Sequence, residues 1–175
     1  MAELLPIVEL GNPILHQVAR SIVNIQDQSV QTLIDDLLLT VKQSNGVGIA
    51  APQVAQSCQL MIVASRPNPR YPNAPEMEPT ALINPQILAH STEIVKGWEG
   101  CLSIPGIRGI VPRYQAIEIE YCDRNGKRQK TEMTDFVARI FQHELDHLNG
   151  LVFLDRVEST QDLVTEKEYQ QQISQ

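Results

Sequence analysis

Hydrophobic positions along the chain follow two different periods, and these divide it into helices and strands. Residues 27–46, DQSVQTLIDDLLLTVKQSNG, carry apolar side chains three and four residues apart, which predicts an amphipathic helix that ends at Gly46. A second helix is predicted in TDFVARIFQHELDHLNG, with Thr134 or Asp135 at its start and Gly150 at its end. A short helix is expected within GNPILHQVA, residues 11–19, because proline suits a first helical turn.

Strands are predicted on two kinds of evidence. AIEIEYC, residues 116–122, alternates apolar and polar side chains, and the Asn125–Gly126 pair after it is typical of a hairpin turn. KRQKTEM, residues 127–133, is therefore the expected partner strand. Extended structure is also expected in three further segments: QLMIVAS at 59–65, TALINP at 80–85 and TEIVKGWEGCLSIPG at 92–106.

The order of these elements predicts the fold class. Strands on both sides of only two or three helices indicate an α+β fold. We expect a single compact domain over residues 1–175, in which antiparallel β-sheets pack around the central helix that carries HELDH. Five prolines in residues 66–79 predict an extended surface loop. The polar segment 156–175 is expected to form a helical tail.

Composition narrows the class of protein. A net charge of −7 without a long basic run argues against a specific nucleic-acid site. No apolar run approaches the roughly 18 residues of a membrane span, and the start resembles neither a secretory signal nor an obvious transit peptide. The three cysteines form no C-x-x-C pair, which argues against a disulfide framework. We expect a cytoplasmic protein without membrane contact; an organellar origin would require that a transit peptide has been removed.

The segment HELDH carries the strongest chemical signal. His143 and His147 are four residues apart, so on a helix they share one face and can bind one metal ion. Glu144, beside the first histidine, is placed to take a proton from a water that the metal activates. A catalytic metal of this kind needs a third protein ligand and one open position, whereas a purely structural metal needs no general base.

The residues themselves leave the third ligand open. Position 153, where one class of HExxH protease has a third histidine, is Phe153. Glu166 and Glu168 lie at a distance that suits a second class, but in a sparse polar tail. Cys101, in GWEGCLSIPG, would complete a set of one thiolate and two imidazoles.

The remaining histidines and cysteines are expected to have ordinary roles. His16 and His90 are interpreted as surface or capping groups. Cys58 and Cys122 are interpreted as free thiols buried in strands.

Three segments together resemble the motifs of the peptide deformylase family, in the family's order and spacing. They are GVGIAAPQ at 46–53, EGCLS at 99–103 and QHELDH at 142–147. GNPILHQVA and the LINP strand also resemble family segments, so the resemblance covers most of residues 4–155. At Gly106 the chain departs from many bacterial members, which have an acidic residue there, and its proline-rich loop at 66–79 is longer than in the shortest members.

The resemblance implies a metal-dependent hydrolase that removes the N-formyl group from the N-terminal formylmethionine of new polypeptides and releases formate. It implies one divalent metal per chain, bound by Cys101, His143 and His147. Ferrous iron is the first expectation, and nickel, cobalt or zinc suit the same ligands. The implied partners are N-formylmethionyl nascent peptides, met by a monomer in transient proximity to the ribosome.

The resemblance also implies catalytic roles. Glu144 would take the proton of the attacking water and deliver it to the leaving amine. The side-chain amide of Gln53 and the backbone N–H of Leu102 would donate to the oxygen that becomes negative.

Further residues are expected around the substrate. Gly46 and Gly48 would let the substrate backbone approach closely. Glu99 would position its loop through an ion pair with Arg108 or Arg139.

An apolar pocket is expected for the methionine side chain. Phe136 and Ile140 share the helix face of the two histidines, and we expect them to contact that side chain with Val47 opposite. The sequence leaves Trp98 undecided between core and pocket. Two rival functions remain at this point: a zinc endopeptidase that uses Glu166 or Glu168, and a domain with a structural metal.

Overall fold

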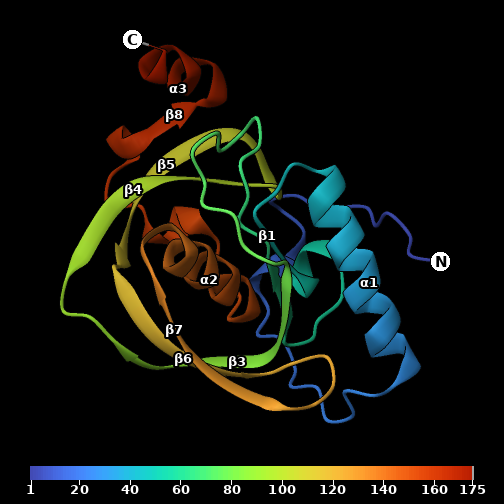
Figure 1. The fold of residues 1–175 in the computed structure, drawn as a ribbon. Coiled ribbons are helices and arrows are strands. Elements are labelled where there is room, and N and C mark those ends of the chain that lie inside the picture. The colour runs from blue at the N-terminus through green and yellow to red at the C-terminus, as the bar shows by residue number, and fades with distance from the viewer. Residues whose placement is uncertain (175) are drawn as a thin grey trace.

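The computed structural model describes residues 1–174, which form three α-helices and eight strands (Figure 1). The α-helices are α1 (Gln28–Gln43), α2 (Asp135–Leu148) and α3 (Glu166–Ile173). The strands are β1 (Gly48–Ala50), β2 (Leu60–Val63), β3 (Thr80–His90), β4 (Ile94–Cys101), β5 (Ile104–Tyr114), β6 (Ala116–Cys122), β7 (Arg128–Thr134) and β8 (Leu163–Thr165). Four short 3-10 helices complete the set: η1 (Pro13–His16), η2 (Ala51–Val54), η3 (Phe153–Arg156) and η4 (Thr160–Asp162).

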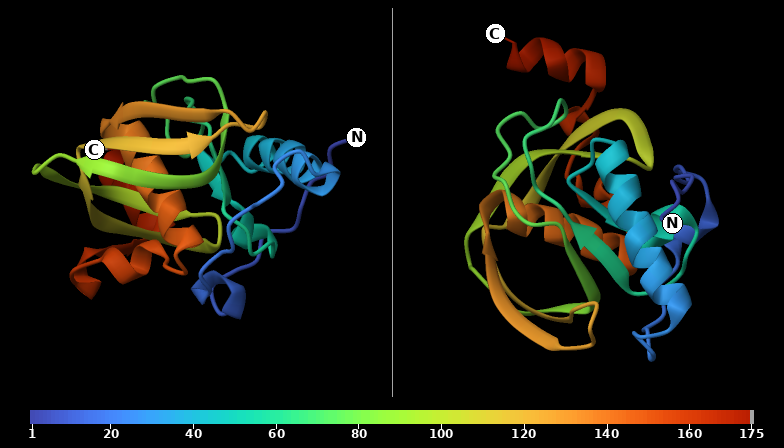
Figure 2. Two further views of the ribbon diagram at one scale, coloured as in Figure 1. Left: turned by 90° about the horizontal axis from the view of Figure 1, so that it is seen from below. Right: turned by 45° about the vertical axis from the view of Figure 1, so that its right-hand side comes forward.

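The strands form two antiparallel sheets that enclose α2. The larger sheet has the order β1-β2-β3-β6-β7, and the smaller has the order β4-β5-β8. Helix α2 contacts strands of both sheets, while α1 lies outside, against β1 and β2 (Figures 1 and 2). The prediction of an α+β fold with antiparallel sheets around the HELDH helix is confirmed.

The continuous apolar run of β2 is explained by burial on both faces of the larger sheet. Met61 and Val63 belong to the core shared with α2, whereas Leu60 and Ile62 pack in the core that includes α1. A strand that is covered on both sides has no solvent face and therefore no apolar–polar alternation. The two-residue period is visible instead in β6, where Ile117 and Ile119 are buried and the residues between them are more exposed.

The first long helix begins as predicted but ends differently. Asp27 accepts a hydrogen bond from Ser29 N at the N-terminus of α1. At the C-terminus, Asn45 has the left-handed backbone conformation, with φ 52°, and Gly46 is not among the residues with positive φ. Asn45 therefore ends the helix, because a short polar side chain tolerates this conformation.

The tail prediction is correct only in part. Residues 166–173 are helical, but Leu163–Thr165 form β8, which pairs with Ile107–Gly109 of β5. The expected helix at 11–19 is reduced to the 3-10 turn η1, which Asn12 caps by accepting from Ile14 N. The proline-rich segment 66–79 contains no helix or strand of the described chain, as expected for a surface loop.

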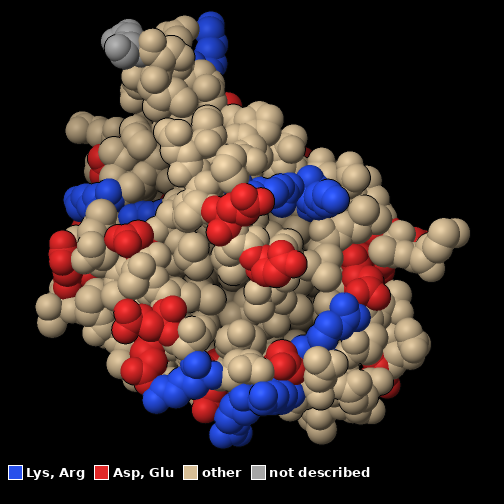
Figure 3. Space-filling model, viewed as in Figure 1, with Lys and Arg blue, Asp and Glu red and all other residues tan. Residues whose placement is uncertain are grey.

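The charged surface is mixed. Figure 3 shows basic and acidic side chains interspersed on the viewed face, without a broad area of one sign. None of the helices in residues 1–174 combines the length and the apolar character that crossing a membrane demands.

Candidate metal centre and active site

Two elements bring three potential metal ligands together. His143 and His147 lie one turn apart on α2, and Cys101 is the last residue of β4. One ligand atom from each residue lies within 4.8 Å of the other two, and the Cys101 Sγ to His147 Nε2 distance is 3.3 Å. All three side chains are buried. The structure therefore assembles the set that the sequence analysis expected.

Glu166 and Glu168 do not reach this cluster. Glu166 accepts hydrogen bonds from Arg108, and Glu168 is exposed on α3. The alternative of a glutamate as third ligand is therefore not supported by the geometry. His16 and His90 also lie elsewhere, at the end of η1 and at the end of β3, where His90 stacks on Tyr114.

The surroundings of Cys101 favour its thiolate. Burial opposes ionisation, but the neighbouring His147 and His143 outweigh it and hold the pKa of the Cys101 thiol well below its ordinary value. A thiolate with two imidazoles is a donor set that suits Fe²⁺, Co²⁺, Ni²⁺ and Zn²⁺. The chemistry of the three donors therefore fits a divalent metal.

Glu99 orients the first histidine. His143 Nδ1 lies 2.9 Å from Glu99 Oε2 and donates to it, which leaves Nε2 of the ring as the free ligand atom. Glu99 also accepts from Arg113 Nε at 2.8 Å and from Arg139 Nη1 at 3.0 Å. Arg113 and His143 hold the pKa of this carboxyl far below its usual range, in spite of its burial.

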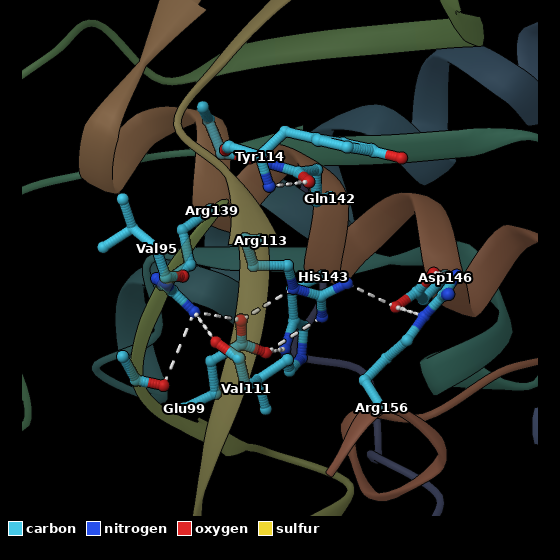
Figure 4. Close-up of polar contacts among 12 residues, drawn as sticks. Val95, Glu99, Val111, Arg113, Tyr114, Arg139, Gln142, His143, Asp146 and Arg156 are labelled. Atoms are coloured by element: carbon cyan, nitrogen blue, oxygen red, sulfur yellow. Dashed lines mark hydrogen bonds and ion pairs between the residues drawn. The ribbon is translucent and has the colours of Figure 1, made fainter. Parts of the chain in front are cut away.

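The expected ion pair of Glu99 is thus right for Arg139 and wrong for Arg108. The guanidinium of Arg108 instead faces Glu166, on the other side of β5. Arg113, which the sequence analysis did not single out, is the main partner, and its Nη1 also donates to Asp146 Oδ2 at 2.6 Å (Figure 4). In the sequence, Asp146 between the two motif histidines was the signal for this buried ion-pair network.

Glu144 lies buried beside the ligands. Burial raises the pKa of its carboxyl to about 7, against the opposing charges of His143 and His147. Its Oε2 has no hydrogen-bond partner within the described residues, so this oxygen is free for the reacting groups. A Cβ at Gly48 would lie 2.5 Å from Glu144 Oε1, so only glycine at this position admits the carboxylate.

Gln53 is fixed from both ends of its amide. Its Oε1 accepts from Ala50 N at 2.9 Å, and its Nε2 lies 3.5 Å from Cys101 Sγ and 3.2 Å from Ser103 Oγ. The amide N–H₂ is therefore aimed at the metal cluster. Ser103, a completely buried residue that sequence reasoning missed, supports this orientation.

The N-terminal segment braces the same region. Val8 N donates to Gln53 O and Leu10 N donates to Ser103 O, each at 2.8 Å. Leu102 and Ser103 form the turn between β4 and β5, directly after Cys101. A Cβ at Gly46 would lie 3.1 Å from Leu102 Cδ1, so this glycine permits the turn to pack closely against the first motif.

One pocket collects the expected substrate-binding residues. It is lined by Gly46, Val47, Gly48, Gln53, Glu99, Cys101, Leu102, Phe136, Ile140, His143 and Glu144. Trp98, which the sequence left undecided, also lines it. Arg70, Tyr71, Gly100 and Arg139 are additional lining residues that sequence reasoning did not assign to it. The pocket therefore joins the metal cluster to an apolar wall.

Comparison with known proteins relates the whole chain to one family. The family model described as polypeptide deformylase matches residues 4–162. The chain is 68% identical over 172 residues to peptide deformylase 2 of Nostoc sp., with 98% of this chain and 96% of the relative covered. It is 47% identical over 152 residues to peptide deformylase 2 of Shewanella oneidensis, with 87% and 83% covered.

Solved structures of peptide deformylases are also similar to this chain. A class I type b peptide deformylase from Acinetobacter baumannii with bound Met-Ala-Ser is 44% identical, with a TM-score of 0.87 and coverage of 90% of this chain and 100% of that chain. A peptide deformylase from Synechococcus elongatus in complex with actinonin is 36% identical, with a TM-score of 0.80 and coverage of 90% and 81%.

Proposed function

The chain belongs to the polypeptide deformylase family, metal-dependent enzymes that remove the N-formyl group from nascent peptides, and we propose that Cys101, His143, His147 and Glu144 carry out this hydrolysis. One observation supports this assignment above the others. The three potential ligand atoms lie within 4.8 Å of one another, beside the buried carboxylate of Glu144, one oxygen of which has no hydrogen-bond partner in the described residues. A structural metal would need no such general base.

We infer that the metal is Fe²⁺ and that one ion binds per chain. The soft thiolate of Cys101 and the two imidazoles support this choice, and Ni²⁺, Co²⁺ or Zn²⁺ could replace it. Cys101→Ala should lose bound metal and activity together. Cys58→Ala and Cys122→Ala should keep both, because these thiols lie outside the cluster. Metal content per chain, measured by elemental analysis, checks the assignment.

Each residue has one task in the proposed reaction. When bound, the metal supplies a Lewis acid that polarises the formyl group and lowers the pKa of water. Glu144 takes a proton from the attacking water and delivers it to the leaving amine nitrogen, so that formate and a free amino terminus result. Gln53 Nε2 and the N–H of Leu102 donate to the formyl oxygen as it becomes negative.

The pocket supports selection of methionine. Phe136, Ile140 and Val47 offer the apolar lining that an unbranched thioether side chain needs. Gly48 leaves room for Glu144 and for the peptide backbone, and Glu99 keeps His143 in place. We also propose that the protein works as a cytoplasmic monomer that meets its substrates in transient proximity to the ribosome.

The decisive experiment compares two substrates. Nickel-loaded protein is incubated with formyl-Met-Ala-Ser and, separately, with casein. We expect formate from the first and no cleavage of the second. Cleaved casein without formate would favour the endopeptidase, and no reaction with either substrate would leave only a structural metal.

A further inference from the structure

Arg108 of β5 is completely buried, yet it lies on the side of that strand away from the Glu99 network. Its guanidinium contacts two aromatic rings: Cζ lies 5.0 Å from the ring centroid of Tyr71 and 4.7 Å from that of Tyr169. Tyr71 belongs to the proline-rich loop and Tyr169 to α3. This Arg108 stack (Tyr71, Arg108 and Tyr169) therefore joins two segments that are far apart in sequence.

The buried charge of Arg108 is compensated mainly by α3. Glu166 accepts from Arg108 Nε at 2.7 Å and from Nη2 at 3.3 Å, while Gln170 Nε2 donates to Glu166 from the next turn. Arg108 Nη1 is buried and has no hydrogen-bond partner in residues 1–174. An uncompensated buried charge is costly. Without α3, the guanidinium would have to move toward solvent.

The Arg108 stack borders the proposed substrate pocket. Tyr71 packs on Phe136, with ring centroids 5.4 Å apart, and Tyr169 packs edge-on against Trp98 at 5.4 Å. Tyr71, Trp98 and Phe136 all line the pocket. A Cβ at Gly100, next to Cys101, would lie 3.0 Å from Arg108 Cδ. Tyr169 of α3 thus contacts the pocket wall directly at Trp98, whereas Glu166 reaches it through Arg108 and Tyr71.

Helix α3 and the proline-rich loop lie at the same end of the molecule. Figure 1 and the right view of Figure 2 show α3, beyond the smaller sheet, at the same end of the molecule as the loop formed by residues 66–79. Strand β8 holds the start of α3 there by pairing with β5.

We propose that Glu166 and Tyr169 of α3 are positioning residues for the methionine pocket and so set the enzyme's preference for methionine as the first residue. Through Arg108 they hold Tyr71, and with it Phe136, in place. Tyr169 also holds Trp98 directly. This inference rests on the proposed deformylase function. Neither residue touches the metal ligands, so their loss should affect substrate selection more than the chemical step.

The test measures selectivity in nickel-loaded enzyme. For Tyr169→Ala we expect KM for formyl-Met-Ala-Ser to rise about fivefold to tenfold, with kcat within about twofold of wild type. The ratio of kcat/KM for formyl-Met-Ala-Ser to that for formyl-Leu-Ala-Ser should fall by about the same factor as the rise in KM. This ratio does not depend on the fraction of active enzyme, so partial unfolding of the variant cannot mimic the result.

Matched variants separate positioning from general stability. Tyr169→Phe keeps the ring and should retain the wild-type Met/Leu ratio of kcat/KM. Glu166→Gln should lower this ratio, as Tyr169→Ala does. Glu168→Gln, exposed on the same helix, should leave KM and the ratio unchanged. Wild-type ratios in both Tyr169→Ala and Glu166→Gln would overturn the inference. Absence of formate with the wild-type enzyme would instead refute the proposed function.

Discussion

At the scale of single residues, Glu144 separates catalysis from metal binding. It lies beside the ligand cluster but is not one of its three ligand residues. Glu144→Gln keeps the size and shape of the side chain but removes the base. We expect kcat to fall about 10²–10⁴-fold, the usual contribution of a general acid–base, with bound metal unchanged. Elemental analysis beside formate release checks this prediction, and loss of metal in parallel with activity would contradict it.

Gly48 makes the position of Glu144 possible. In Gly48→Ala, the new Cβ would meet Glu144 Oε1 at 2.5 Å and Ile140 Cγ2 at 2.8 Å, so the carboxylate must shift. A small displacement of a catalytic group strongly lowers the reaction rate, so we expect kcat to fall about 10²-fold at full metal occupancy.

Gly126→Ala is the control for Gly48→Ala. Gly126 lies in the turn between β6 and β7 with φ 81°, and its nearest neighbour would be 3.9 Å from the new Cβ. This variant should lose some stability through the strained backbone, but it should retain the wild-type kcat. If the two variants show equal kcat, the explanation for Gly48 is wrong.

At the scale of elements, Arg113 of the smaller sheet connects that sheet to helix α2. From β5 it binds Glu99 of β4 and Asp146 of α2, and Arg156 of η3 also reaches Asp146 (Figure 4). The Arg113 and Glu99 side chains are only 5% and 4% exposed, so water cannot replace a lost partner. The network therefore fixes the distance between the elements that carry Cys101 and the histidines.

Removal of Arg113 should affect both stability and metal affinity. Arg113→Ala would remove one charged partner from each of the buried carboxylates of Glu99 and Asp146, a type of change that costs about 3–5 kcal/mol of unfolding free energy. The altered orientation of His143 should weaken nickel binding about 10–100-fold. Urea unfolding and a chelator competition measure the two effects.

Lys130→Ala provides the control at this scale. Lys130 pairs with Glu118 on the exposed face of β6 and β7, where both side chains are accessible to solvent. An exposed pair contributes at most about 1 kcal/mol, so this variant should remain close to wild type in both assays. Equal losses in Arg113→Ala and Lys130→Ala would show that burial of the network is irrelevant.

At the scale of the whole molecule, a bound metal would link β4 of the smaller sheet to α2. Because the folded chain alone presents the three ligands together, metal should stabilise the native state. At free nickel of about 100 Kd the gain is about 2.7 kcal/mol. For a chain of this length, that corresponds to a rise in Tm of roughly 5–10 °C. Calorimetry of metal-free and nickel-loaded protein measures it.

Cys101→Ala tests whether this stabilisation comes from the proposed site. Its Tm should respond little to nickel, since only two of the three ligands remain. A shift as large as that of wild type would place the stabilising ion elsewhere in the chain.

Local sequence determined the elements and the identity of the reactive groups. The periodicity of residues 27–46 and 134–150, the Asn125–Gly126 turn and the four-residue spacing of His143 and His147 all act within one or two turns of chain. Such signals depend on the steric and hydrogen-bonding preferences of residues close in sequence, so they can be recognised without knowledge of the fold. The motif resemblance then pointed to Cys101, Gln53 and Leu102 as companions of the helix.

Tertiary structure alone decided which distant residues became partners. By sequence, Arg108, Arg113 and Arg139 are equivalent cations, and their different roles follow from the face of β5 or α2 on which each lies. Arg108 points to Glu166 and Arg113 to Glu99, because successive side chains of a strand alternate between faces and Arg113 is five residues further on. Likewise, Leu163–Thr165 carry no strong strand pattern, and they become β8 because the edge of β5 offers them hydrogen bonds. Pairing of this kind depends on contacts between residues far apart in sequence, which no local pattern encodes.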